Sequence, residues 1–157
     1  MIMKRILSLI LIAAAVIFAG CGKDDLTKNE LTIGDTTMAL TSVIADADGA
    51  YHFDADDADQ TFHVYGMMKK STLGKEYDMA KIYEGEDDFW FGVNGLNGSY
   101  IGYYSIRSND DHISFTSGTW SSELKKGNLV ITVKGTLKSG DAFELHIAKP
   151  EEEIEAY

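Results

Sequence analysis

The chain has 157 residues, of which 25 are acidic and 14 are lysine or arginine, so its formal charge at pH 7 is −11. Such an acidic surface argues against nucleic acid or anionic lipid as a direct partner, since both attract basic side chains. A single cysteine excludes an internal disulfide, so the domain depends on its own hydrophobic core.

The first 20 residues have the pattern of a secretory signal peptide. Lys4 and Arg5 form a short basic head, and residues 6–18 follow as an uncharged apolar run. This run is too short for a bilayer-spanning helix, which needs about 20 residues. We therefore expect residues 1–20 to be cleaved before Cys21, with a membrane anchor helix or an ordinary secreted leader as the alternatives.

The motif FAGC, residues 18–21, resembles the lipobox of bacterial lipoproteins, with Phe18 in place of the usual aliphatic residue. The resemblance implies that Cys21 becomes the first residue of the mature protein, with a diacylglycerol on its sulfur and an acyl chain on its amine. Several acyl chains on one residue anchor a protein stably, whereas a single chain binds a membrane only reversibly. Cys21 is thus predicted to be the lipid attachment site.

The residues after this cysteine extend the resemblance. Lys23, Asp24 and Asp25 look like the acidic export signal of surface lipoproteins in the Bacteroidetes. This implies transfer to the outer face of the outer membrane. The alternative is an ordinary solvated tether. Residues 21–30 are accordingly predicted to be the lipidated cysteine and a flexible acidic tether.

From residue 31 onward, apolar and polar residues alternate with a period of two, which is typical of half-buried strands. No window has a sustained helical apolar stripe, so we expect at most one short helical turn, near residues 71–76. The predicted strands are residues 38–44, 50–54, 61–67, 76–83, 89–93, 99–107, 112–116, 129–134 and 143–148.

This pattern predicts an all-β fold, an antiparallel β-sandwich of about 8–10 short strands, with a small closed β-barrel of lipocalin or streptavidin type as the alternative. Gly135 is expected to mark a bulge or a sharp bend. Residues 31–149 would form one domain, and residues 150–157 an acidic C-terminal tail. The leader, the tether and the closing strands together resemble small β-sandwich lipoproteins of gut Bacteroidetes, a resemblance that implies no catalytic residues.

An Asp-rich run, residues 46–59, is the first candidate for a binding site. Calcium prefers several carboxylate and carbonyl oxygens. The spacing does not fit a helix-loop-helix calcium loop, because Ile44 and Ala55 would fall on ligand positions. An irregular site across a hairpin remains the metal-binding hypothesis, against a solvated acidic loop and no cofactor at all. Its predicted calcium ligands are Asp46, Asp48, Asp54 and Asp57.

The aromatic residues are the second candidate. Trp90 alternates with Phe89 and Phe91, so on a strand it points to the opposite face from the two phenylalanines. If that face is exposed, a sugar ring could stack on Trp90 and the tyrosines beside it, with Asn94, Asn97 and nearby aspartates bonding the hydroxyls. The alternative is that these rings fill the core. The predicted ligand-binding residues are Trp90, Tyr103 and Trp120.

The histidines are predicted to be solvent-exposed, because each lies at the opposite parity to the apolar residues of its strand. They are His52, His63, His112 and His146. A zinc site would need three of them to converge, and none has a close sequence partner.

These features favour a lipid-anchored, surface-exposed lipoprotein of the outer membrane. The first hypothesis is a non-catalytic binding module for a glycan or a small molecule. The second is a structural or protein-interaction lipoprotein that docks to an outer-membrane protein through a sheet edge or its acidic face. An enzyme comes third, because the sequence has no serine elbow or phosphate loop and its only thiol is predicted to be lipidated.

Overall fold

The computed structural model describes residue 26 and residues 28–85, 88–95, 100–107 and 113–156, and for residues 42–48, 100, 101, 103 and 156 it describes the backbone only. These residues form eleven strands and two short 3₁₀ turns. The elements are β1 (Glu30–Ile33), β2 (Thr36–Asp48), β3 (Ala50–Asp57), β4 (Phe62–Lys69), η1 (Lys70–Thr72), β5 (Glu76–Asp78), β6 (Phe89–Gly95), β7 (Tyr100–Ser105), β8 (Phe115–Lys125), β9 (Asn128–Leu137), β10 (Ala142–Pro150), η2 (Glu151–Glu153) and β11 (Glu155–Ala156).

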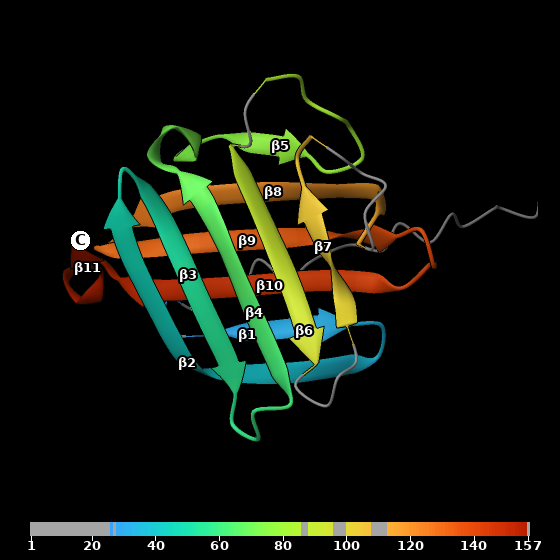
Figure 1. Cartoon of the computed structure of the whole chain (residues 1–157), viewed down its shortest axis with the longest axis horizontal. Coiled ribbons are helices and arrows are strands. Elements are labelled where there is room, and N and C mark those ends of the chain that lie inside the picture. The colour runs from blue at the N-terminus through green and yellow to red at the C-terminus, as the bar shows by residue number, and fades with distance from the viewer. Residues whose placement is uncertain (1–25, 27, 86–87, 96–99, 108–112, 157) are drawn as a thin grey trace, which may run out of the picture.

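Ten strands follow one hydrogen-bonded path, β5-β8-β9-β10-β1-β2-β3-β4-β6-β7, in which every neighbouring pair is antiparallel. The long strand β2 serves both halves of the path, because its first residues pair with β1 and the rest with β3. The register shifts between Leu40 and Ser42, where β2 passes from one half to the other. In Figure 1, β3, β4, β6 and β7 cross steeply over β8, β9, β10 and β1. The chain is therefore a curled antiparallel sheet folded into two layers, which confirms the predicted all-β class.

A cluster of stacked aromatic rings lies in the core between the two layers, among aliphatic side chains. Trp120 stacks on Phe89 with ring centroids 4.1 Å apart, and Phe91 stacks on Tyr104 at 5.5 Å. All four side chains are fully buried. The strand alternation produces this packing, since β3 buries every second residue and exposes the residues between them.

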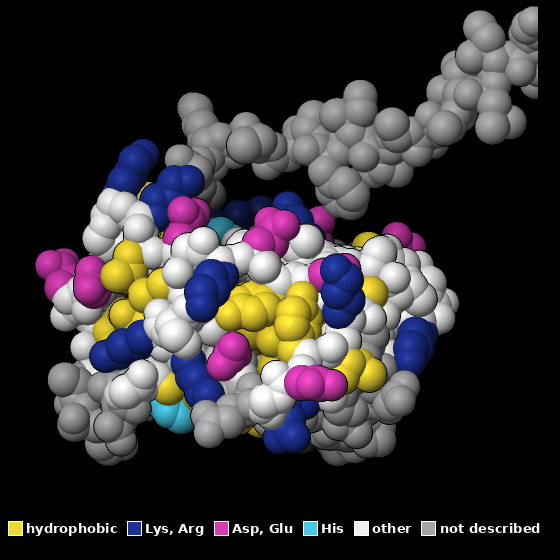
Figure 2. All heavy atoms as spheres, turned by 90° about the horizontal axis from the view of Figure 1, so that it is seen from above, with side chains coloured by type: hydrophobic (Ala, Val, Ile, Leu, Met, Phe, Trp, Pro, Cys, Tyr) yellow, Lys and Arg dark blue, Asp and Glu magenta, His cyan; other side chains and the backbone are white. Residues whose placement is uncertain are grey.

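A loop joins the two ends of the sheet, β5 and β7, which do not pair with each other in the described residues. Tyr83 N donates a hydrogen bond to the Ile106 carbonyl, and the Tyr104 hydroxyl donates one to the Met79 carbonyl. Burial, helped by nearby Tyr83 and Asp78, raises the pKa of Tyr104, so this hydroxyl keeps its proton. Seen from the β5 side, apolar side chains gather between lysines and carboxylates (Figure 2). The loop thus closes the sheet into a barrel-like shape without a strand ladder.

Several predicted boundaries are wrong. The strand predicted at residues 76–83 ends at Asp78, because the following residues form the closing loop. Another strand, β8, extends to Lys125, well beyond the predicted residues 112–116. The bulge expected at Gly135 lies on the partner strand, between Phe115 and Ser117.

The C-terminal segment also differs from the prediction of an acidic tail. Pro150 is the last residue of β10, and the three glutamates form η2. The chain then adds β11, whose Glu155 pairs in parallel with Asp46 of β2. Backbone pairing with β2 therefore holds this segment against the sheet.

Candidate functional site

The two outer sheet faces differ in chemistry. On the layer of β8, β9 and β10, many of the outward residues are hydroxyl-bearing or charged, and Val130, Ala142 and Ala148 are apolar exceptions. A shallow groove of about 720 Å³ lies over β5 and these strands, and its lining includes Asp78, Thr119, Lys134, Thr136 and Glu144. None of its lining residues is aromatic. This is the ordinary composition of a solvated sheet face.

The outer face of β3, β4 and β6, which is turned toward the viewer in Figure 1, carries rings instead. We call it the β3–β4–β6 face. The strand register arranges its outward residues in three rows across the strands. The rows are His52, Met67 and Trp90; Asp54, Tyr65 and Gly92; and Asp56, His63 and Asn94. Alternation places these residues outside, because their strand neighbours fill the core.

Two half-exposed rings form the centre of this face. The ring of Tyr65 lies over Gly92, since a Cβ atom on that glycine would come within 2.5 Å of Tyr65 Cζ. Tyr65 and Trp90 meet edge to face, with centroids 6.0 Å apart and planes at 71°. The glycine therefore provides the space in which Tyr65 lies across β6 beside Trp90.

His63 lies between two carboxylates. Its Nε2 is 3.2 Å from Asp54 Oδ1, and its Nδ1 is 2.9 Å from Asp56 Oδ1. The side chains of the histidine and the two aspartates are 29%, 57% and 35% exposed, respectively. The imidazole ring also stacks on Tyr65, with centroids 5.4 Å apart and planes at 17°. Only the imidazolium form can donate to both carboxylates at once.

Asn94 lies across from His63 on the same face. Its side-chain oxygen is buried and has no hydrogen-bond partner in the described part of the chain. A buried acceptor without a partner costs about 1–3 kcal/mol. The row of Asn94 therefore has an unsatisfied acceptor as well as the carboxylate of Asp56.

The structure places the predicted aromatic residues in different environments. Trp90 lies on the β3–β4–β6 face, as a binding role requires. Trp120 is wrong as a surface residue, because it is 0% exposed and stacks on Phe89 in the core. Tyr103 pairs with Gly92 through the backbone, and its side chain lies outside the description. The predicted anchor and export signal lie wholly outside the described residues. They are Cys21, Lys23, Asp24 and Asp25.

The four predicted calcium ligands do not form a described site. Asp57 uses its carboxylate in the β3–β4 turn, where it accepts hydrogen bonds from Thr61 N at 2.6 Å, Thr61 Oγ1 at 2.6 Å and Phe62 N at 2.9 Å. Asp54 faces His63 instead. The side chains of Asp46 and Asp48 lie outside the description. Among the described residues, no group of three or more His, Cys, Asp or Glu could hold a metal ion.

The hydrogen bonds also set the charge of Asp57. Desolvation acts to raise its pKa, but the bonds from Phe62 and Thr61 outweigh this effect, so the pKa lies below its ordinary value. The carboxylate thus stays charged at neutral pH and holds the turn.

Sequence reasoning missed Tyr65 and the role of His63. Both lie at the outward parity of the segment HVYGM, and the outward glycine of FWFGV faces Tyr65. The predicted outward orientation of the histidines is confirmed for His52 and His63, and His146 lies on the other layer, where it bonds Thr132. His112 lies outside the described residues.

No family model, curated protein or solved structure matches the chain. None of the helical turns within the described ranges is long and apolar enough to cross a membrane.

Proposed function

We propose that the chain is a lipid-anchored lipoprotein on the outer surface of the outer membrane, where it binds a glycan without catalysis. Its binding site would be the β3–β4–β6 face. The observation that carries this proposal is the pair of half-exposed rings, Tyr65 and Trp90, on a sheet face that also presents carboxylates and an amide.

Sugar rings stack on aromatic side chains because their C–H faces are apolar, while their hydroxyls need hydrogen-bond partners at the rim. Tyr65 and Trp90 supply the aromatic surface. Asp54 and Asp56 supply acceptors in the adjoining rows. The groove on the other outer face offers hydroxyls and charges but no ring, so the β3–β4–β6 face suits a sugar better.

The arrangement of His63 favours binding over catalysis. A general base needs a ring nitrogen that can accept a proton from the substrate. Both nitrogens of His63 already face carboxylates, Asp54 and Asp56. The histidine therefore fixes the two carboxylates in place beside Tyr65.

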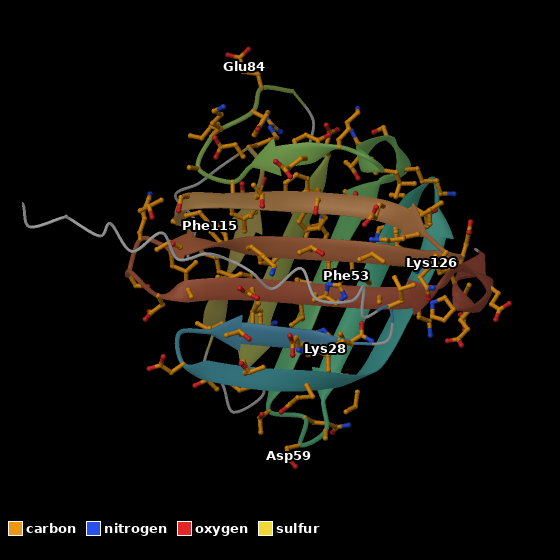
Figure 3. All side chains as sticks on the ribbon, turned by 180° about the vertical axis from the view of Figure 1, so that it is seen from behind. Lys28, Phe53, Asp59, Glu84, Phe115 and Lys126 are labelled. Carbon is orange, nitrogen blue, oxygen red and sulfur yellow. The ribbon has the colours of Figure 1, made fainter. Side chains whose placement is uncertain are left out.

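The described chain begins on the layer opposite the β3–β4–β6 face, where a tether from Cys21 would therefore join the domain. Asn29 is fixed there, since its side chain accepts a hydrogen bond from Ala148 N at 2.7 Å and its carbonyl accepts one from Leu40 N. Lys28 lies over the outer face of this layer (Figure 3). An extended chain from Cys21 to Lys28 spans at most about 27 Å. An anchor at Cys21 would thus leave the β3–β4–β6 face turned away from the membrane.

Binding of the full chain, purified from membranes in detergent, to a glycan array tests the function. We expect at least one glycan to bind and Trp90→Ala to weaken that binding about tenfold or more, because the stacking surface is lost. Ile82→Ala is the matched control, since Ile82 is an apolar side chain that is 61% exposed outside this face. Loss of binding in both variants, or in neither, would argue against this site.

A docking role is the second candidate, and β7 favours it. Within the described part of the chain, β7 pairs with β6 on one side and with no strand on the other. Such an edge can accept a strand from a partner protein. A folded chain that binds no glycan on the array would favour this role.

A further inference from the structure

The polar groups around the two rings are mostly hydrogen-bond acceptors. Asp54 and Asp56 each use one carboxylate oxygen, Oδ1, for His63. Their second oxygens have no partner among the residues that the structure describes. A ligand of this face must therefore present donors.

The charge of this face further limits which class of sugar could bind. Within β3, β4 and β6, the titratable groups that face His63 or lie in the same rows are His52, Asp54, Asp56 and Tyr65. The rows continue to Asp46 of β2 and Tyr103 of β7, whose side chains lie outside the description. One imidazolium cannot neutralise two carboxylates. The whole chain is also acidic, with a formal charge of −11. An anionic sugar would be repelled, whereas an ammonium group would be attracted.

We propose that the sugar bound on the β3–β4–β6 face carries an amino group, whose ammonium ion lies between Asp54 and Asp56 beside the ring of Tyr65. This inference rests on the proposed glycan-binding function. Ammonium N–H groups are donors only, which matches an acceptor-rich rim. A cation beside an aromatic ring gains a further attraction when it lies over the ring face.

His63 occupies the place that this ammonium would use. In the free protein its ring nitrogens lie 3.2 Å from Asp54 Oδ1 and 2.9 Å from Asp56 Oδ1. A bound ammonium would contact the same carboxylates, so it has to displace the imidazole ring, and a protonated ring would also repel it. His63 is therefore a competitor of the ligand, and its removal is expected to strengthen binding.

Calorimetry with the full chain in detergent, in mildly acidic buffer, tests this inference. The probes are a glucosamine tetrasaccharide with charged amines, its N-acetylated counterpart, and a galacturonic acid tetrasaccharide. We expect the amine form to bind about tenfold more tightly than the neutral form, and the acidic form not to bind. Added salt would weaken the amine form most.

The variants separate a binding role from a structural one. We expect Asp54→Asn and Asp56→Asn to abolish the preference for the amine, while His63→Gln raises the affinity for the amine about threefold or more. Asp59→Asn is the control, because Asp59 is exposed in the β3–β4 turn outside the three rows. Unfolding by urea checks that each variant is folded.

The outcomes also separate this inference from the proposed function. Equal binding of the amine and neutral forms, with Trp90→Ala still damaging, would overturn the amine specificity and leave the glycan site in place. Weaker binding of the amine form by His63→Gln would overturn the proposal that His63 competes with the ammonium group. Failure of all three probes and of the glycan array would overturn both proposals.

Discussion

Asp57 shows how one carboxylate can determine a turn. It ends β3, and its oxygens accept three hydrogen bonds from Thr61 and Phe62 at the start of β4. Its carbonyl also accepts a bond from Gln60 N, and Gln60 has a positive φ of 52°. The turn therefore relies on this side chain to hold an unfavourable backbone conformation.

Replacement of Asp57 by alanine should lower the free energy of unfolding by about 1–3 kcal/mol at neutral pH, since two backbone N–H groups lose a charged acceptor. The pKa of Asp57 is lower in the folded than in the unfolded chain, so this stabilisation is present above the unfolded pKa and is lost as the pH falls through the folded pKa. Urea unfolding at neutral pH and at about pH 3 measures the difference. Asp59→Ala should change little. An equal loss at both pH values would contradict the role of the charge.

The sequence could not show which aspartates of the acidic run were already engaged. Composition allowed a calcium site as an alternative to a solvated loop, whereas the position of Asp57 before Thr61 and Phe62 decides that its oxygens face backbone N–H groups. Trp120 is different, because its burial could have been predicted. In GTWSSEL it stands between Thr119 and Ser121, and a strand that exposes these two residues must bury the tryptophan.

At the scale of elements, the close approach of β8 and β9 depends on a pair of glycines, Gly118 and Gly135. A Cβ atom on Gly135 would lie 2.5 Å from the Ser117 carbonyl oxygen and 2.8 Å from the Phe115 ring. The bulge lies on β8 at these two residues, while Gly135 keeps a regular register with Phe143. Periodicity in one strand predicts where a ladder is disturbed, but it cannot tell which of the two strands carries the extra residue.

We expect Gly135→Ala to lower the free energy of unfolding by about 1–3 kcal/mol, because the new methyl group meets backbone that cannot move without breaking the β8–β9 ladder. Gly127→Ala is the control. Gly127 lies in the β8–β9 turn with φ of 75° and nothing within 4 Å of its Cβ position, so only the backbone strain of about 1 kcal/mol applies. Denaturant unfolding of both variants measures the comparison. A smaller loss for Gly135→Ala than for Gly127→Ala would show that the strands can separate here.

At the scale of the whole molecule, the fold class followed from strand period and turn spacing, whereas the arrangement of the layers did not. The long strand β2 joins the two layers, and its bulge after Leu40 lies in a segment that reads as one continuous strand. The loop that joins β5 and β7 is held by hydrogen bonds from Tyr83 to Ile106 and from Tyr104 to Met79, residues that are more than 20 positions apart in the sequence. Such pairings come from tertiary packing, which local periodicity does not report.

The start of the described chain and the β3–β4–β6 face lie on opposite layers of the molecule, which leads to a prediction for the intact cell. A lipid on Cys21 and an outward signal at Asp24 and Asp25 would present the β3–β4–β6 face to the medium. Cys21→Ser should therefore abolish labelling by a fatty-acid analogue and release the chain from the membrane fraction, because no acyl chain remains to hold it. The Asp24→Asn, Asp25→Asn double variant should keep the lipid but lose cleavage by protease added to intact cells.

Glu151→Gln with Glu152→Gln controls for the change in charge, since both glutamates are exposed in η2 and lie far along the chain from the anchor. This control should remain lipidated and accessible to protease. If Cys21→Ser stays in the membrane fraction, another segment of the chain holds it there. If protease cleaves the Asp24 and Asp25 variant as readily as the control, the acidic cluster is only a solvated tether. The orientation of the β3–β4–β6 face must then be set by the anchor alone.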